Sequence, residues 1–93
     1  MIRSFKDKRT EAVMAGETPK GIDPKIVKRA RLILIAVDGF GVELDVWRIP
    51  GAGAKKLGGD RAGQRSLRVN DQWRICYRWT GLGPADVELT NYH

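Results

Sequence analysis

Cysteine, histidine and long apolar runs are scarce in this sequence of 93 residues, and each scarcity removes a class of protein. The single cysteine, Cys76, cannot form an internal disulfide and fits a reducing compartment. One cysteine and one histidine, without clustered ligands, predict no metal site, and we expect no cofactor. No apolar run reaches the roughly 18 residues that cross a bilayer, so no membrane partner is expected. The N-terminus lacks the apolar stretch of a signal peptide, which predicts a cytoplasmic protein.

Familiar catalytic motifs are missing as well. The glycines form neither a Gly-x-x-x-x-Gly-Lys phosphate loop nor a dinucleotide fingerprint, and no carboxylate pair suited to glycoside chemistry is identifiable. Cys76 is interpreted as a small strand residue rather than a nucleophile, because the only histidine lies at the far end of the chain. The length predicts one domain over residues 1–93 with one modest core.

Positive charge is concentrated in residues 48–78. This segment has eight basic and two acidic side chains, so it carries the whole net charge of +6. Six of the eight are arginines, whose planar fork matches phosphate and carboxylate. A polyanionic partner is therefore favoured, since phosphate contacts release condensed counterions. The alternative is a solvated face that only keeps the protein soluble.

A β-hairpin is predicted over residues 61–79. Two runs of alternating apolar and polar residues flank Asn70-Asp71-Gln72, and a three-residue loop there places Leu67 opposite Ile75 and Arg68 opposite Arg74. The pattern predicts one buried apolar face, which includes Trp73, and one arginine-lined face. Like charges placed directly opposite are unfavourable, so the second face should bind an anion. The arginines assigned to it are Arg65, Arg68, Arg74 and Arg78.

The rest of the chain predicts an α+β domain. Residues 2–5 alternate and predict a short strand, residues 6–15 a short helix, and Asp23-Pro24 the start of a helix to about Val37. Strands are predicted at 54–57 and 86–91, and the apolar residues of 44–49 should cover the core edge. Two helices before an antiparallel meander should pack on one face of the sheet and leave the arginine-lined face open.

The residue types at this open face suit RNA cleavage without a metal. In such a reaction the ribose 2′-OH attacks the adjacent phosphate. A histidine can shuttle the proton near neutral pH, an arginine can stabilise charge on the phosphorus, and a tyrosine can stack on a base. Arg74, Tyr92 and His93 are these residue types. A terminal histidine without a function is the alternative at this point.

Three motifs carry a resemblance to a known family. They are Gly59-Asp60-Arg61-Ala62-Gly63, the run Ser-Leu-Arg-Val-Asn-Asp-Gln-Trp-Arg-Ile over 66–75, and the ending Val-Glu-Leu-Thr-Asn-Tyr-His over 87–93. Together with residues 1–6 and 21–25, they resemble the HigB toxins of the RelE superfamily, once called plasmid maintenance system killer proteins. The resemblance spans nearly the whole chain. It implies the compact RelE-type microbial ribonuclease fold.

The resemblance also implies a function and partners. Such toxins belong to type II toxin–antitoxin systems and inhibit translation as ribosome-dependent mRNA endoribonucleases (mRNA interferases), cleaving in the A site without a metal. The implied partners are a HigA-type helix-turn-helix antitoxin, the 70S ribosome with its mRNA, and operator DNA reached indirectly through the toxin–antitoxin complex.

Site residues follow from the same motifs. Arg74 matches the catalytic arginine of the family, and Tyr92 and His93 match its C-terminal pair. Asn91 stands where an aspartate is frequent and cannot act as a base. Many members carry a histidine and a lysine in the loop before Gly-Asp-Arg, and here those positions fall on Lys55 and Gly58. The residues expected to bind RNA phosphates are Lys55, Lys56, Arg61, Arg65, Arg68 and Arg78.

These departures keep a second hypothesis open. A non-catalytic or weakly catalytic toxin-like protein would act through antitoxin binding and promoter autoregulation, or by occupying the ribosome. A plain DNA-binding module is disfavoured, because no helix-turn-helix spacing is evident.

Overall fold

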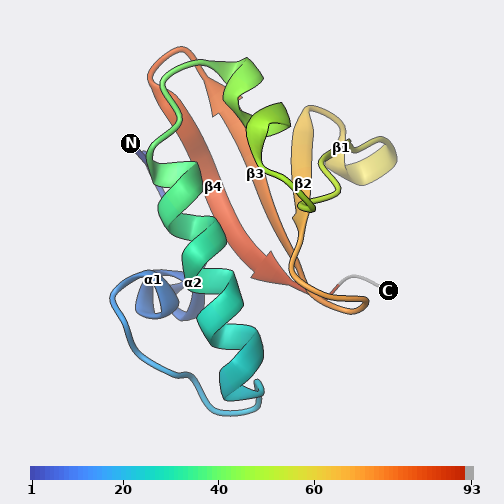
Figure 1. Cartoon of the computed structure of the whole chain (residues 1–93). Coiled ribbons are helices and arrows are strands. Elements are labelled where there is room, and N and C mark those ends of the chain that lie inside the picture. Colours follow the sequence, from blue (N-terminus) through green and yellow to red (C-terminus); the bar gives the residue numbers. More distant parts are fainter. Residues whose placement is uncertain (92–93) are drawn as a thin grey trace.

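The computed structural model describes residues 1–91 and is an α+β domain built on an antiparallel sheet, as the sequence predicted (Figure 1). The sheet is a meander in the order β1-β2-β3-β4, and the helices precede most of it. In chain order, the elements within the described residues are α1 (Lys8–Met14), α2 (Pro24–Asp38), the 3₁₀ helix η1 (Glu43–Arg48), β1 (Lys55–Lys56), the 3₁₀ helix η2 (Gly59–Arg61), β2 (Gln64–Arg68), β3 (Arg74–Thr80) and β4 (Gly83–Thr90).

Aspartate caps fix where both α-helices begin. The Asp7 carboxylate accepts from the Thr10 N–H at 2.7 Å, so α1 begins at Lys8 and is shorter than the predicted helix. Asp23 accepts from the Lys25 N–H at 2.8 Å, with Pro24 as the first helical residue, as predicted. Each cap satisfies a backbone donor that the first helical turn leaves unpaired.

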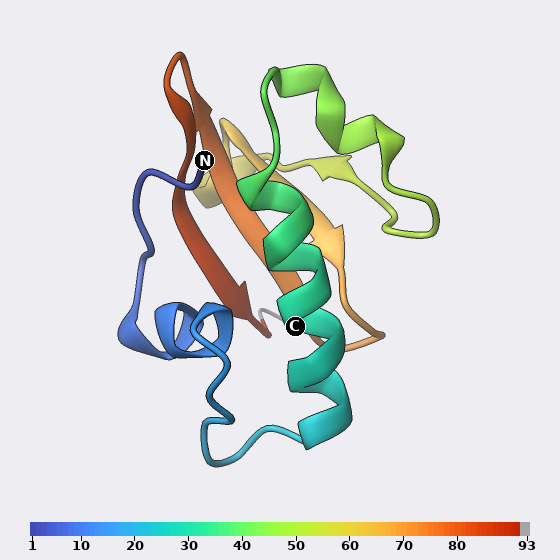
Figure 2. The same cartoon turned by 60° about the vertical axis from the view of Figure 1, so that its left-hand side comes forward.

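The core lies between α2 and one face of the sheet (Figure 2). Helix α2 buries a stripe that includes Val27, Leu34 and Val37, and the sheet supplies Leu67 and Tyr77 among others. Each such side chain contributes about 1.5–3 kcal/mol when it leaves water. This packing fixes which face of every strand is covered, and therefore which face is left for a partner.

The hairpin has the predicted register. Leu67 lies opposite Ile75 and Arg68 opposite Arg74. The Asn70 side chain accepts hydrogen bonds from two backbone N–H groups of the loop, at 2.9 and 2.7 Å, which holds the three-residue turn. Trp73 is half-buried rather than fully buried, and the Arg9 guanidinium lies 5.2 Å from the centre of its ring.

The N-terminal segment is not the strand that its alternation predicted. It runs beside β4 with a single parallel bridge, between Phe5 and Val87. The Arg3 N–H donates to the Pro84 carbonyl at 2.7 Å, and the Val87 N–H donates to the Ser4 carbonyl at 3.1 Å. Too few residues share this pairing to form a ladder, yet it ties the first residues to the last strand.

Residues 43–48 form η1, and only part of this segment covers the core edge. Side chains three residues apart share one side of a 3₁₀ helix. Val46 is buried and Ile49 is half-buried against the core, as expected, whereas Leu44 and Trp47 are exposed, so the prediction was wrong for these two. In the described part of the chain, no helix is long and apolar enough to span a bilayer.

Candidate RNA-binding face and active site

The face of the sheet opposite α2 is here called the arginine face. Side chains alternate along a strand, so residues that flank the core positions Leu67 and Ile75 point to this face. Its members on the three longer strands are Gln64, Ser66, Arg68, Arg74, Cys76, Arg78, Glu88 and Thr90.

Arg74 lies in a fixed position on the arginine face. Its Nε–H donates to Ser66 Oγ at 2.9 Å, and its Nη2 donates to the Gly53 carbonyl at 3.0 Å. The side chain therefore crosses β2 and reaches the loop before β1, and only 9% of the residue is exposed. Gly53 has φ +55°, so the residue that supplies this acceptor has a backbone conformation that favours glycine. Arg74 lies opposite Arg68 as predicted, but the expectation of an open face was wrong at this residue, because its side chain is mostly buried.

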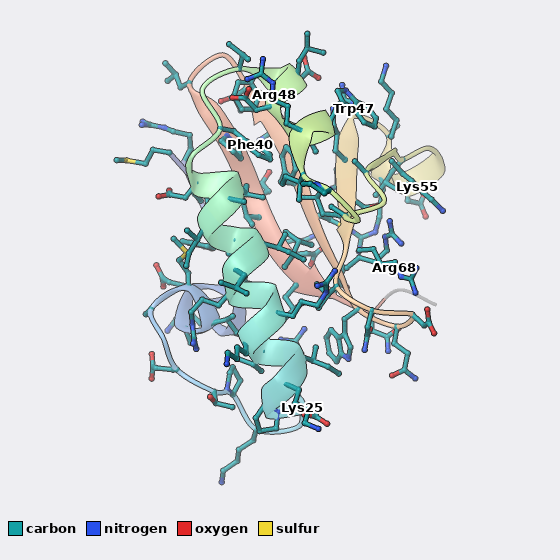
Figure 3. The ribbon with its side chains drawn as sticks, viewed as in Figure 1. Lys25, Phe40, Trp47, Arg48, Lys55 and Arg68 are labelled. Atoms are coloured by element: carbon teal, nitrogen blue, oxygen red, sulfur yellow. The ribbon has the colours of Figure 1, made fainter. Side chains whose placement is uncertain are left out.

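Two more cations lie beside Arg74. Arg68 is directly opposite it on β2 and is half-exposed, with the carboxylate of the loop residue Asp71 as its ion-pair partner. Lys55 is exposed and lies opposite Ser66, so it points to the same face. Both lie on the β1–β2 side of the molecule, far from Lys25 at the start of α2 (Figure 3). An anion at this edge of the sheet would meet several positive charges.

Glu88 organises a second group of charges on the same face. Its carboxylate is mostly buried and lies 2.6 Å from Arg61 Nη1 and 3.8 Å from Lys6 Nζ. Arg61 also donates to the Gln64 side chain at 3.1 Å. The carboxylate thus holds the Arg61 guanidinium at the sheet, while the group as a whole keeps an excess of one positive charge.

Cys76 lies between these charges and is not a nucleophile. The pKa of its thiol is raised from 9.0 to about 11, mainly by burial and to a smaller extent by Glu88, while Arg61 and Arg74 act in the opposite direction. The thiol is therefore protonated at neutral pH, as the interpretation of a small strand residue requires. The charges of Arg61, Arg74 and Glu88 all act on this thiol, so these three side chains lie in one small region of the face.

Arg78 lies at the far end of the face. It pairs with Asp86 at 3.0 Å, and both side chains are about half-exposed. A shift in the β3–β4 register falls between Cys76 and Arg78, and Asp86 has φ +51° there. An exposed pair of this kind is screened by water, so Arg78 remains able to contact another anion.

Two of the predicted phosphate-binding residues do not lie on the arginine face. Arg65 has the same parity along β2 as Leu67 and is opposite Tyr77, so it points to the helix side of the sheet and is 8% exposed. Lys56 is opposite Arg65 and points to the same side. The prediction placed four arginines on one face. It was wrong for Arg65, because side chains alternate along β2 and Arg65 therefore lies on the same side as Leu67.

The remaining predicted site residues are the last three of the sequence. Asn91 follows β4 directly and is exposed. Tyr92 and His93 lie outside the described residues. Since β4 ends beside the start of β3, where Thr90 is opposite Arg74, the chain leaves the sheet at the Arg74 end.

Sequence reasoning missed four groups at this face. Ser66, Glu88 and Lys6 hold or surround the arginines, and the Gly53 carbonyl fixes Arg74. The parity of Ser66 and Glu88 with the arginine positions was available as a signal, whereas the position of a loop carbonyl was not. Among residues 1–91, no group of three or more His, Cys, Asp or Glu side chains is placed to hold a metal ion.

Comparison with known proteins agrees with this architecture. The family model described as "RelE-like toxin of type II toxin-antitoxin system HigB" matches residues 3–93. The YoeB–YefM complex from Staphylococcus aureus contains a chain of the same fold, with a TM-score of 0.63, 22% sequence identity, and coverage of 100% of this chain and 95% of that one. No curated protein sequence matches. Because the family model covers almost the entire length, the chain belongs to the HigB-like, RelE-type toxins of type II toxin–antitoxin systems.

Proposed function

We propose that this protein is a ribosome-dependent mRNA endoribonuclease that stops translation by cutting mRNA in the A site. The observation that carries the proposal is Arg74, fixed by Ser66 and Gly53 among the cations of the arginine face. A guanidinium that is already oriented needs no rearrangement when charge develops on a substrate, and such preorganised donors are a large source of rate. Membership of the toxin family supports the same activity.

The reaction that suits these residues needs only proton transfers and charge stabilisation. The ribose 2′-oxygen attacks the neighbouring phosphorus and its proton passes to a base. The bond to the 5′-oxygen breaks, and that oxygen receives a proton, which leaves a 2′,3′-cyclic phosphate and a 5′-hydroxyl. Arg74 would stabilise the extra negative charge on the phosphoryl oxygens, while Tyr92 and His93 are proposed to orient the base and to carry protons.

The remaining cations are proposed to bind the RNA backbone. Arg61 is held by Glu88, and Lys55 and Arg68 lie beside Arg74, so they could contact phosphates on either side of the scissile bond. Phosphate contacts position the strand without reading its sequence. Asn91 cannot accept the proton as a carboxylate would, and the proposed reaction therefore depends on His93 more strongly than in relatives that end in Asp-Tyr-His.

The proposed partners follow from the family. One solved structure of the same fold is a complex of YoeB with YefM, and the matching family model describes a toxin of a type II toxin–antitoxin system. We propose that the antitoxin of this chain is a HigA-type helix-turn-helix protein, that the complex binds operator DNA through it, and that the protein acts in the cytoplasm on 70S ribosomes.

Expression of the toxin alone, followed by mapping of mRNA 5′ ends, tests the activity. New ends at codon-associated positions within translated regions are expected, and they should be absent when His93 is replaced by alanine. Growth arrest without new ends would instead favour a protein that occupies the ribosome without cutting, the hypothesis that Asn91 motivates.

A further inference from the structure

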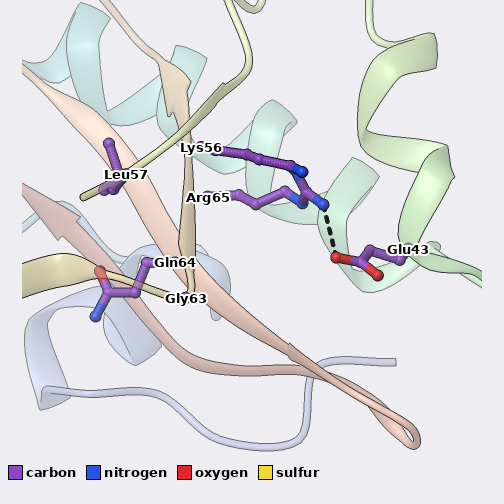
Figure 4. A pocket seen from close by; sticks show the side chains of 6 residues that line it. All are labelled: Glu43, Lys56, Leu57, Gly63, Gln64 and Arg65. Carbon is purple, nitrogen blue, oxygen red and sulfur yellow. Dashed lines mark hydrogen bonds and ion pairs between the residues drawn. The ribbon is translucent and has the colours of Figure 1, made fainter.

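A pocket of about 260 Å³ opens at the β1–β2 edge on the helix side of the sheet, away from the arginine face (Figure 4). Alternation sends Lys56 and Arg65 to this side and Lys55 and Ser66 to the other, so the sheet lies between the two cations of the pocket and Arg74, while Gln64 of the arginine face borders the pocket at the strand edge. We call it the Arg65 pocket. Its lining residues are Glu43, Lys56, Leu57, Gly63, Gln64 and Arg65.

Arg65 has hydrogen-bonding capacity that its own chain does not use. Its Nη2 donates to Glu43 at 2.6 Å, but Nε and Nη1 are buried and have no partner within the described residues. The hydroxyl of Tyr77, the cross-strand neighbour of Arg65, is buried without a partner as well. Leaving several polar groups unsatisfied in one place is costly, so this cluster favours a ligand that accepts hydrogen bonds.

The charges in the pocket favour an anion. Figure 4 shows the Lys56 and Arg65 side chains running next to each other toward Glu43. Arg65 pairs with Glu43, which is itself about half-exposed, so two cations and one carboxylate leave an excess of one positive charge in the pocket. A second carboxylate would neutralise the remaining positive charge and could form the two-pronged contacts that a guanidinium offers.

The rim of the pocket resembles a protein interface more than an RNA-binding surface. The Trp47 ring lies 5.3 Å from the Arg65 guanidinium and is 49% exposed, and Leu44 on the same 3₁₀ helix is 66% exposed. Tryptophan and arginine are enriched among the few residues that contribute most of the binding energy in protein–protein interfaces. An RNA backbone has no apolar group to cover Trp47 and Leu44, whereas a protein segment with an acidic side chain next to an apolar one could occupy both the pocket and its rim.

We propose that the Arg65 pocket is an anchor site for the antitoxin, in which an aspartate or glutamate side chain of the partner enters beside Lys56 and Arg65 while an apolar neighbour covers Trp47. This inference rests on the proposed function for the existence of the partner, and it adds the surface and the chemistry of contact. It also places the antitoxin anchor on the side of the sheet opposite to Arg74.

The adjacent lysines of β1 provide a matched test, because they are both exposed and point to opposite sides. The probe is the HigA-type antitoxin proposed above, which we expect to be encoded next to this gene, titrated into the toxin by calorimetry. Lys56→Glu should weaken binding at least tenfold, and Lys55→Glu less than twofold. Thermal melting of each variant serves as the control for folding.

Other outcomes would overturn the proposal. Equal effects of Lys55→Glu and Lys56→Glu would mean that only net charge matters. Loss of binding in Leu32→Glu, on the exposed side of α2, together with unchanged binding in Lys56→Glu, would place the anchor elsewhere. Loss of mRNA cleavage but not of partner affinity in Lys56→Glu would assign the pocket to RNA. The cleavage assay reads the proposed nuclease activity separately, so its failure is distinguishable from failure of the pocket.

If the proposal holds, single acidic residues of the partner can be matched to the pocket. Each aspartate and glutamate of the partner is changed to its amide and measured against wild-type toxin and Lys56→Glu. For one acidic residue of the partner, the losses of affinity caused by its amide variant and by Lys56→Glu should be non-additive by at least fivefold, because the two changes remove the same contact. Additive effects for every acidic residue would contradict direct entry of a carboxylate.

Discussion

Replacing Arg74 should separate its structural role from its catalytic one. In Arg74→Ala, the hydrogen bonds to Ser66 Oγ and the Gly53 carbonyl are lost, and Ser66 is fully buried. A hydrogen bond from a charged donor contributes about 1.5–3 kcal/mol, so the loss of two should lower the free energy of unfolding by at least about 3 kcal/mol. Domains of this size have about 5–15 kcal/mol in total, so the variant should remain folded at 25 °C.

The catalytic effect should be larger than the loss of stability explains. Removing one preorganised donor to developing charge costs about 10²–10³ in rate. Arg74→Lys keeps the positive charge and can retain one of the two hydrogen bonds, so it should recover about half of the stability. It should recover little cleavage, because an ammonium group cannot contact Ser66, Gly53 and a phosphate in the same fork.

Urea denaturation and mapping of cleaved mRNA ends measure the two effects. Arg78→Ala is the control for stability, because this arginine lies on the same strand and its pair with Asp86 is half-exposed. Its unfolding free energy should change by about 1 kcal/mol or less. The reasoning is refuted if Arg74→Ala is as stable as wild type, or if Arg74→Lys cuts mRNA at the wild-type rate.

Three further predictions concern the fold around the site. Thr10→Val should cost about 1–3 kcal/mol in urea denaturation, with Thr10→Ser near wild type, because the fully buried hydroxyl accepts from the Leu89 N–H at 2.8 Å. The unfolding free energy should decrease between pH 9 and about 11, because the Cys76 thiol ionises in the unfolded chain at a lower pH than in the folded protein. Cys76→Ala should make this decrease with pH smaller. The same decrease in the variant would contradict the prediction. Trp73→Ala should cost about 2 kcal/mol, below the 3–5 typical of a buried tryptophan, because the ring is half-buried under Arg9.

The parts of the fold that local rules determine were predictable. The register of the hairpin followed from the pleat, since a shift by one residue would have moved Leu67 and Ile75 out of the core. The start of α2 followed from Asp23 and Pro24. The same alternation rule places Arg65 on the helix side, because it is two residues from Leu67 on β2. The prediction grouped Arg65 with the other arginines of the segment and was therefore wrong for this residue.

Other features depend on contacts that a sequence does not display. The inward turn of Arg74 needs the Gly53 carbonyl, whose position is set by an irregular loop more than 20 residues earlier in the chain. The Trp47 side chain points outward because of the 3₁₀ geometry of η1, and a helix of this length shows little periodicity in the sequence. The Arg65 pocket exists only because η1 returns Glu43 and Trp47 to the edge of the sheet.

The attachment of the N-terminal segment to β4 has a consequence for synthesis. Arg3 and Ser4 precede their backbone partners Pro84 and Val87 by more than 80 residues, so they are made long before them. The core also needs Val87 and Leu89, which are fully buried. A growing chain therefore cannot complete the domain before Leu89 has left the exit tunnel. For a protein proposed to attack translating ribosomes, this order would keep the domain incomplete while its own ribosome makes the residues before Leu89.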